Sequence, residues 1–340
     1  MRATINLRIT RITQITALVW SLLAATPAWS LDVLPPPPVV AQLMQADQTD
    51  ELQVTTKEKA HEYIPCMEWV DPKVPVKAAI VCVHGCGLHK GSWTAFGERM
   101  APLGYAIYAV DVRGFGSFAK MDDKGTRQID FKGCLKDVEE ALRYVRKVQP
   151  NVPIYIAGES MGGAISLRMT AIHPELVDGL ISSVPAGDRY HMLSDGIKVA
   201  FHLFTSPNKT MSVEETIVDR STVKTDLRER WKGDPMARFN LKPIELVQFQ
   251  MFCDANKKFA KKITDTPVLV LQGEVDKLVK ADSTKSITEM IASKDSQCVV
   301  VQGSEHLLLE ENQFNDDIIN VLLAWLEEHI KNGTHVKASK

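Results

Sequence analysis

Short apolar runs alternate with helical patterns along most of this chain, and that alternation limits the fold more than any other feature. Six runs rich in Val, Ile and other apolar residues recur: Ala78–Val83, Tyr105–Val110, Ile154–Ala157, Val177–Ile181, Val268–Leu271 and Cys298–Val301. Runs of this kind are typical of parallel strands that are covered by helices on both faces of a sheet. The sequence therefore predicts an α/β fold with a doubly wound, mostly parallel sheet.

Helical patterns fill the segments between these runs. They span Trp93–Leu103, Phe131–Val148, Met161–Ile172, Ser283–Ser293 and Asp316–Lys331. An opening antiparallel strand pair is expected around Val54–Trp69. Between residues 187 and 262 the alternation stops, and helical segments that carry Met and Phe replace the Val-rich strands. The chain is therefore divided into a core of residues 55–186 and 263–331 and a helical cap, residues 187–262, inserted over the carboxyl ends of the strands.

The first 54 residues differ in composition from this body. Residues 1–30 hold three arginines and no acidic residue, then a short apolar stretch and a small-x-small sequence ending at Ser30. This order is typical of a signal peptide for export, to the periplasm or the extracellular space. An uncleaved membrane anchor is the alternative. Residues 31–54 begin with a run of four prolines, Pro35–Pro38, and are interpreted as a stiff linker.

Composition excludes several classes of protein. The formal net charge is −2 and no block of basic residues stands out, so nucleic acid is not an expected partner. Six cysteines in 340 residues do not form a disulfide scaffold, and none has zinc-site spacing with histidine. No apolar run reaches the ~20 residues that span a bilayer.

One motif predicts a nucleophile. Residues Gly158 to Gly162 read Gly-Glu-Ser-Met-Gly, between the apolar run Ile154–Ala157 and a helical segment. A G-x-S-x-G sequence between a strand and a helix is the context of a nucleophile elbow, in which glycines permit a sharp turn and the serine hydroxyl projects from it. Ser160 is therefore the candidate nucleophile.

A serine hydroxyl needs a base, and the base needs an acid to orient it. Of the nine histidines, His306 lies four residues beyond the strand Cys298–Gln302, on the same edge of the sheet as Ser160. Asp276 lies four residues beyond the strand Val268–Gln272. Glu274 and Asp282 compete with Asp276 for the role of the acid. The predicted set is Ser160, Asp276 and His306, in that chain order.

The segment His84-Gly85-Cys86-Gly87 follows the first core strand and is the expected oxyanion loop. The backbone N–H groups of Cys86 and Met161 are the expected donors to a substrate oxygen. For His84, a structural hydrogen-bonding role competes with that of a base. A nucleophilic Cys86 thiol is the alternative to Ser160.

These blocks together resemble the monoacylglycerol lipase and lysophospholipase branch of the α/β-hydrolase superfamily, also described as serine aminopeptidase-like hydrolases. The resemblance covers about residues 60–331. The matching blocks are 84–87, Asp111–Ser117, 158–163, 273–276 and 303–306, and the Asp-Pro pair at 234–235 resembles an element of the family's cap. In that family Ser160, Asp276 and His306 would carry the triad, and Asp111–Ser117 would form a structural loop. The family often has His where Glu159 stands.

The resemblance implies a serine hydrolase of carboxylic esters that forms an acyl-enzyme and needs no metal or organic cofactor. The expected partner is a small-molecule or lipid ester, such as a monoacylglycerol or lysophospholipid, with transient contact to a membrane surface. A small-ester or thioester esterase, an aminopeptidase and a non-catalytic binding protein are the alternatives. The oligomeric state is not indicated.

An apolar stripe in the cap segment Met192–Phe204 includes Phe201 and Phe204, at helical spacing. One interpretation is that the stripe packs on the core. The other is that it contacts the acyl chain, which makes Phe201 and Phe204 candidate substrate-binding residues.

Overall fold

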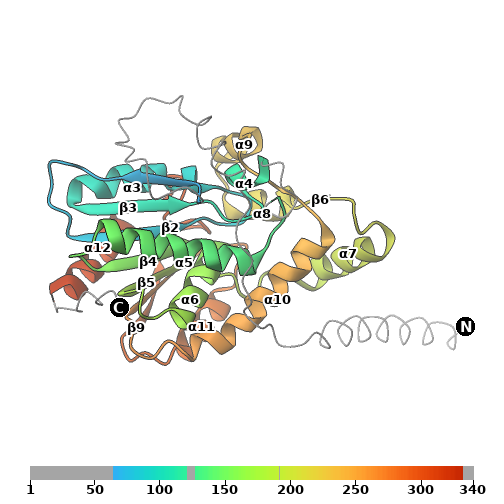
Figure 1. Cartoon of the computed structure of the whole chain (residues 1–340). Coiled ribbons are helices and arrows are strands. Elements are labelled where there is room, and N and C mark those ends of the chain that lie inside the picture. Colours follow the sequence, from blue (N-terminus) through green and yellow to red (C-terminus); the bar gives the residue numbers. More distant parts are fainter. Residues whose placement is uncertain (1–63, 121–126, 191, 332–340) are drawn as a thin grey trace, which may run out of the picture. The chain divides into compact units, whose positions relative to one another are not determined.

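A single seven-stranded sheet organises the computed structural model, which describes residues 64–120, 127–190 and 192–331 (Figure 1). Its strand order is β1-β3-β2-β4-β5-β8-β9, and every neighbouring pair is parallel except β1 and β3. The strands are β1 (Cys66–Trp69), β2 (Ala78–Val83), β3 (Tyr105–Val110), β4 (Ile154–Glu159), β5 (Gly179–Ser183), β8 (Val268–Gly273) and β9 (Ser296–Val301). The predicted doubly wound α/β fold is confirmed.

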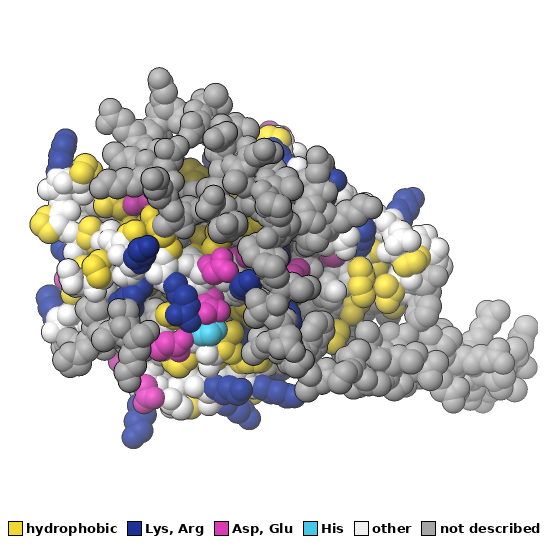
Figure 2. Space-filling view, in the orientation of Figure 1, with side chains coloured by type: hydrophobic (Ala, Val, Ile, Leu, Met, Phe, Trp, Pro, Cys, Tyr) yellow, Lys and Arg dark blue, Asp and Glu magenta, His cyan; other side chains and the backbone are white. Residues whose placement is uncertain are grey.

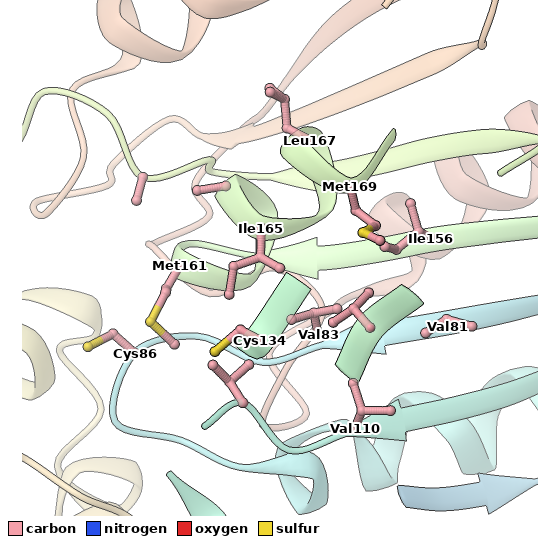
Figure 3. Packing of buried hydrophobic residues seen from close by; sticks show 14 of the residues in the cluster. Val81, Val83, Cys86, Val110, Cys134, Ile156, Met161, Ile165, Leu167 and Met169 are labelled. Carbon is pink, nitrogen blue, oxygen red and sulfur yellow. The ribbon is translucent and has the colours of Figure 1, made fainter. Parts of the chain in front are cut away.

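Helices cover both faces of the sheet because successive strand side chains point to opposite faces. In β2, Ala78, Ile80 and Cys82 join one buried cluster and the alternate residues join the other. The first cluster includes side chains of α3 (Thr94–Met100) and α12 (Asp316–Lys331). The second includes those of α5 (Phe131–Val148), α6 (Met161–Ile172) and α11 (Ala281–Met290). Figure 3 shows this second layer, with Ile165 and Met169 of α6 packed over the strands.

The predicted helices 131–148, 161–172 and 316–331 have the bounds that the sequence indicated. The predicted helix 93–103 is instead three short elements: the 3₁₀ helix η1 (Lys90–Trp93), α3 and the 3₁₀ helix η2 (Ala101–Leu103), which ends where Gly104 takes a left-handed conformation. A five-residue helix, α4 (Gly116–Lys120), was not predicted. Strand β1 pairs with β3, and residues 54–63 of the expected opening pair lie outside the described residues.

Between β5 and β8 the chain forms helices and one short two-stranded ribbon. In order these are α7 (Met192–Thr205), β6 (Met211–Ser212), α8 (Glu214–Ser221), α9 (Thr225–Gly233), β7 (Asn240–Leu241) and α10 (Pro243–Ala260). Helix α10 packs against α6 and α7. The Arg168 guanidinium of α6 lies 3.6 Å from the centre of the Phe252 ring and 4.4 Å from that of Phe259, and it donates to Asn256. These contacts join α10 to α6, the helix that follows Ser160.

The order of the strands determines where a site can form. From β2 the chain moves outward to β3, then crosses to β4 on the other side of β2 and continues in that direction. The reversal leaves the carboxyl ends of β2 and β4 adjacent, and ligands of open α/β sheets bind at such a switch point. The loop after β2 begins at His84 and the turn after β4 holds Ser160, so the topology brings these two predicted segments together. In the described ranges, no helix has both the length and the apolar character to cross a membrane.

Candidate active site

Ser160 occupies a strained turn between β4 and α6. Its φ of 54° and ψ of −112° lie in a region that side-chain-bearing residues rarely adopt. Three backbone hydrogen bonds hold the turn: Ser160 N–H donates to Ser183 at 2.9 Å, and the Ser160 carbonyl accepts from Ala164 at 3.0 Å and from Ala186 at 3.1 Å. This is the geometry of a nucleophile elbow, with the serine at the N-terminus of a helix, where negative charge is favoured.

Glycine is required on both sides of this turn. A Cβ at Gly158 would collide with the backbone of Gly162, and a Cβ at Gly162 would collide with the carbonyl of Val83 in β2. The close approach of α6 to β4 therefore depends on Gly158, and its close approach to β2 depends on Gly162. The G-x-S-x-G spacing reflects this packing as well as the chemistry.

His306 and Asp276 form a buried pair on the loops after β9 and β8. The Nδ1 atom of His306 is 2.8 Å from Oδ2 of Asp276, and the histidine is 2% exposed. The other carboxylate oxygen, Oδ1, accepts from the backbone N–H groups of Leu278 at 2.7 Å and Val279 at 3.0 Å. Gln272 donates to Oδ2 at 3.3 Å. Asp276 is thus fixed by its own loop, and it orients the imidazole.

The charges of this pair shift both pKa values. Burial by itself lowers the pKa of His306, but the nearby carboxylates of Asp276 and Glu159 outweigh it, and the pKa is raised above its ordinary value. Burial raises the pKa of Asp276, but His306 and the N–H donors outweigh it, so that the pKa is lowered. Asp276 is therefore ionised at neutral pH and favours the charged form of His306.

Among the competing acids, Glu274 accepts from Gly303 N–H, and both Glu274 and Asp282 are exposed. Asp276 is the acid that the structure places on His306. Ser160, 8% exposed, lies on the same edge of the sheet, at the end of β4. In the part of the chain that the structure describes, no hydrogen bond joins Ser160 Oγ to the His306 ring. Such bonds are often long in structures without substrate and tighten when substrate binds.

His84 has a structural role in the loop after β2. Val112 N–H donates to its Nε2 at 2.9 Å, so the ring proton lies on Nδ1, which donates to the Gly85 carbonyl at 2.8 Å. Burial lowers the pKa of His84 to about 4, which keeps the ring neutral. The hydrogen-bonding interpretation of His84 fits this geometry, since both ring nitrogens are occupied by the backbone.

Cys86 follows in the same loop and is buried. Figure 3 shows it near the start of α6, where Met161 belongs to the same apolar cluster. Burial raises the pKa of the Cys86 thiol to about 12, so the side chain is a neutral thiol at pH 7. Residues 238 and 239 hold the adjacent Gly87: Arg238 N–H donates to its carbonyl at 2.8 Å, and the Phe239 ring packs against its Cα.

Of the two candidate substrate-binding residues of α7, the structure describes the side chain of Phe201 but not that of Phe204. Phe201 is 64% exposed, so its side chain lies at the surface of the helix and not in an enclosed tunnel. In the described ranges, no group of three or more His, Cys, Asp or Glu side chains could hold a metal ion.

Sequence reasoning missed two buried acids, Glu159 and Glu310. Glu159 stands next to Ser160, and its carboxylate accepts from the backbone of residues 308–310, beyond His306. Glu310 accepts from Gly85 N–H in the oxyanion loop. The Glu at position 159, where the family often has His but also Glu, was a weak signal in the sequence, and nothing local marked Glu310.

A strained serine elbow at the switch point of a mostly parallel sheet, opposite a buried His–Asp pair, defines an α/β-hydrolase. The chain belongs to the family described as serine aminopeptidase, S33, which matches residues 74–313.

Relatives and solved structures agree with this family. Mouse monoglyceride lipase is 27% identical over 277 residues, which cover 79% of this chain and 88% of that protein. A monoacylglycerol lipase of Mycolicibacterium smegmatis is 21% identical and covers 76% of this chain and 91% of its own. A soluble variant of Saccharomyces cerevisiae monoglyceride lipase has a TM-score of 0.66 at 19% identity, covering 78% of this chain and 92% of that one. The chain is a carboxylic ester hydrolase.

Replacing Asp276 by Asn should lower the pKa of His306, because the charge that favours the imidazolium is removed. NMR titration of ¹⁵N-labelled His306 would measure the shift. Glu274→Gln, an exposed neighbour, is the control and should leave the titration unchanged. In the unmutated enzyme ester turnover should fall with decreasing pH through a pKa above 6.5, since only neutral imidazole accepts a proton. An Asp276→Asn protein with an unshifted His306 would contradict the pairing.

Proposed function

We propose that this enzyme hydrolyses monoacylglycerols and related single-chain lipid esters through Ser160, His306 and Asp276. The observation that carries the proposal is the strained Ser160 at the switch point, on the same edge of the sheet as the buried His306–Asp276 pair. The names of the relatives support the substrate class, since the mouse and mycobacterial proteins are monoacylglycerol lipases.

In this mechanism Ser160 Oγ attacks the acyl carbon of the ester while His306 Nε2 takes the hydroxyl proton. Asp276 holds the imidazole through Nδ1 and stabilises its positive charge. The backbone N–H groups of Cys86 and Met161 donate to the oxyanion. His306 returns the proton to the leaving alcohol. Water then attacks the acyl-enzyme, His306 takes its proton, and the carboxylic acid leaves as Ser160 regains its hydrogen.

The thiol alternative is disfavoured by the surroundings of Cys86. The thiolate is the reactive form, and burial raises the pKa of this thiol to about 12. Cys86 therefore contributes its backbone N–H and not its side chain.

Ser160→Ala should abolish ester turnover while the fold is retained, with a loss on the order of 10⁴-fold or more. Turnover of a p-nitrophenyl ester and labelling by a fluorophosphonate would both be measured. Cys86→Ala is the matched comparison and should keep most of the activity, because it retains the backbone N–H. A folded Ser160→Ala protein that still turns over ester would refute the assignment, as would a Cys86→Ala loss of equal depth.

The substrate class can be tested by comparing kcat/KM for monoacylglycerols, lysophospholipids, short acetate esters, thioesters and aminoacyl amides. We expect kcat/KM for monoacylglycerols to rise with acyl length, since each buried CH₂ contributes ~0.8 kcal/mol. The aminoacyl amide arm is included because the family name describes an aminopeptidase. Highest activity on acetate esters or on amides would contradict the lipid proposal.

We further propose that the outer face of α7 and α10 touches the lipid surface on which such substrates lie. Figure 2 shows hydrophobic side chains on the surface at the end of the molecule where α7 lies. Phe201 of α7 and Ile244 and Met251 of α10 are exposed. Phe201→Asp should reduce turnover of monoacylglycerol in phosphatidylcholine vesicles but not of a dissolved acetate ester. The control is Ile172→Asp, an exposed apolar residue at the end of α6 remote from Ser160. Equal effects of the two variants would exclude surface contact by Phe201.

Export is a proposal that depends on the sequence of residues 1–30, which lie outside the described residues. Full-length protein expressed in a secretion-competent host should be recovered outside the cytoplasm and begin at Leu31, as N-terminal sequencing would show. Retention of Met1 on membrane-bound protein would favour the uncleaved anchor, and retention of Met1 in the cytoplasm would contradict both.

A further inference from the structure

The mechanism leaves two buried carboxyl groups beside the site without a role. Glu159 directly precedes Ser160, and Glu310 lies four residues after His306. Both are 0% exposed, and acidic residues are rarely buried so completely unless their oxygens are hydrogen-bonded. Their hydrogen-bond partners lie on different loops of the site. These partners indicate which of the two acids is ionised and which loop each one holds.

In the described part of the chain, one hydroxyl and several backbone N–H groups donate to Glu159. Its carboxylate accepts from Ser183 Oγ at 2.6 Å, from Leu308 N–H at 2.7 Å and from Glu310 N–H at 2.9 Å. Burial raises the pKa of Glu159, but these donors oppose the shift, and a proton on Glu159 would have only Ser183 Oγ among its partners to receive it, so Glu159 is the ionised member of the two. These bonds tie the loop beyond His306 to the residue before Ser160.

Glu310 has a different environment. Its Oε2 accepts from Gly85 N–H at 2.9 Å, and its Oε1 is 2.5 Å from Ser92 Oγ. Ser92 Oγ is also 2.7 Å from the carbonyl oxygen of His89. A hydroxyl has one proton, and a carbonyl can only accept, so the Ser92 proton lies toward His89. The short contact between Ser92 and Glu310 then needs a proton from the carboxyl group, which makes Glu310 the neutral acid.

The charges around Glu310 agree with this assignment. Burial, then the negative charge of Glu159, hold the pKa of Glu310 well above its ordinary range, and Glu311 on the same loop adds to the effect. From β2 the facing group is the Cys82 thiol, whose own pKa burial raises. On the η1 segment the cation of Lys90 is bound to Asp111 at 3.1 Å.

We propose that Glu310, as a neutral acid, is a positioning residue of the oxyanion hole. The Gly85 N–H bond to Glu310 holds the His84–Gly85 peptide, and the bond of the Gly85 carbonyl to His84 Nδ1 holds the next peptide, which carries the Cys86 N–H. With both neighbours of Gly85 Cα held, the Cys86 N–H is directed toward the substrate oxygen. Gly85 has no side chain that would restrict its backbone. A Cβ at this position would lie 3.0 Å from Glu310 Oε2, so the Glu310 carboxyl group packs closely against Gly85 and restricts it instead. This inference rests on the proposed function, because it takes the Cys86 N–H as an oxyanion donor.

The test compares Glu310→Met, which keeps volume but loses the acceptor, with Glu310→Gln. The amide of Gln can accept from Gly85 and donate to Ser92 as the neutral acid does. A misplaced oxyanion donor costs on the order of 10²-fold, so Glu310→Met should lower kcat by about that factor with little change in KM. The kcat of Glu310→Gln should lie within about threefold of that of the unmutated enzyme.

Binding of two inhibitors separates positioning from general destabilisation. A trifluoromethyl ketone forms a tetrahedral oxyanion with Ser160, and its Ki should rise in Glu310→Met by the factor that kcat/KM falls. A non-hydrolysable monoalkyl glycerol ether binds without an oxyanion, and its Kd should stay within about twofold. The control is Asp178→Asn, a buried acid bound to Arg146 and to Ile154 N–H at the opposite edge of the sheet. It should lower Tm without changing kcat per active site.

The two proposals fail in different ways. An unmutated enzyme that neither turns over ester nor binds the ketone would overturn the proposed function and the positioning role with it. An active unmutated enzyme whose Glu310→Met variant keeps its ketone affinity would overturn the positioning role alone. If Glu310→Met does not fold, Glu310→Gln decides: a loss of tenfold or more in ketone affinity would show that the neutral acid is not the functional form.

Discussion

The close contact between the start of α6 and the end of β2 is the constraint on which the site depends. Gly162 lies against the carbonyl of Val83, with no room for a side chain, and Ser160 is held in a strained turn by the Ser183 carbonyl. Backbone strain of this kind costs of order 1–3 kcal/mol and persists only where surrounding structure determines it. Here the determining structure is the buried centre of the sheet, where β2, β4 and β5 are buried throughout.

A second constraint is electrostatic. Asp276, Glu159 and Glu310 bring three carboxyl groups to the surroundings of one imidazole, in a region with little solvent. Of these three acids, Asp276 is the one hydrogen-bonded to the His306 ring, yet Glu159 also raises the pKa of the ring. The cost of burying these groups is offset by N–H donors, because Asp276 and Glu159 each accept at least two backbone hydrogen bonds. The same hydrogen bonds that stabilise the two carboxylates also hold the loop after β8 and the loop that contains His306.

The fold, which is confirmed, and the candidate site residues could both be predicted from the sequence because they leave local signals. Continuous apolar runs predicted the strands, and glycines around Ser160 marked the turn. Asp276 and His306 could be selected because each follows a strand by the same short distance. Glu310 could not be selected, since its partner Gly85 is 225 residues away and no periodicity or spacing links them. The predicted single helix 93–103 is divided into η1, α3 and η2 because the chain turns back toward the sheet in this region. The spacing of apolar residues does not encode such a turn.

The segment between β5 and β8 reaches the site through both backbone and side-chain contacts, and two of the backbone contacts hold the loops of the site. Arg238 N–H donates to the Gly87 carbonyl, and His306 N–H donates to the Ser221 carbonyl at 3.3 Å. Glu305, beside His306, strengthens the second contact by accepting from Thr222 Oγ1 and Val223 N–H. Backbone partners do not depend on side-chain identity, so the residues that face a substrate can differ without displacing the oxyanion loop or His306. The exposed face of α7 lies outside these contacts, which separates the surface that would meet lipid from the elements that perform the chemistry.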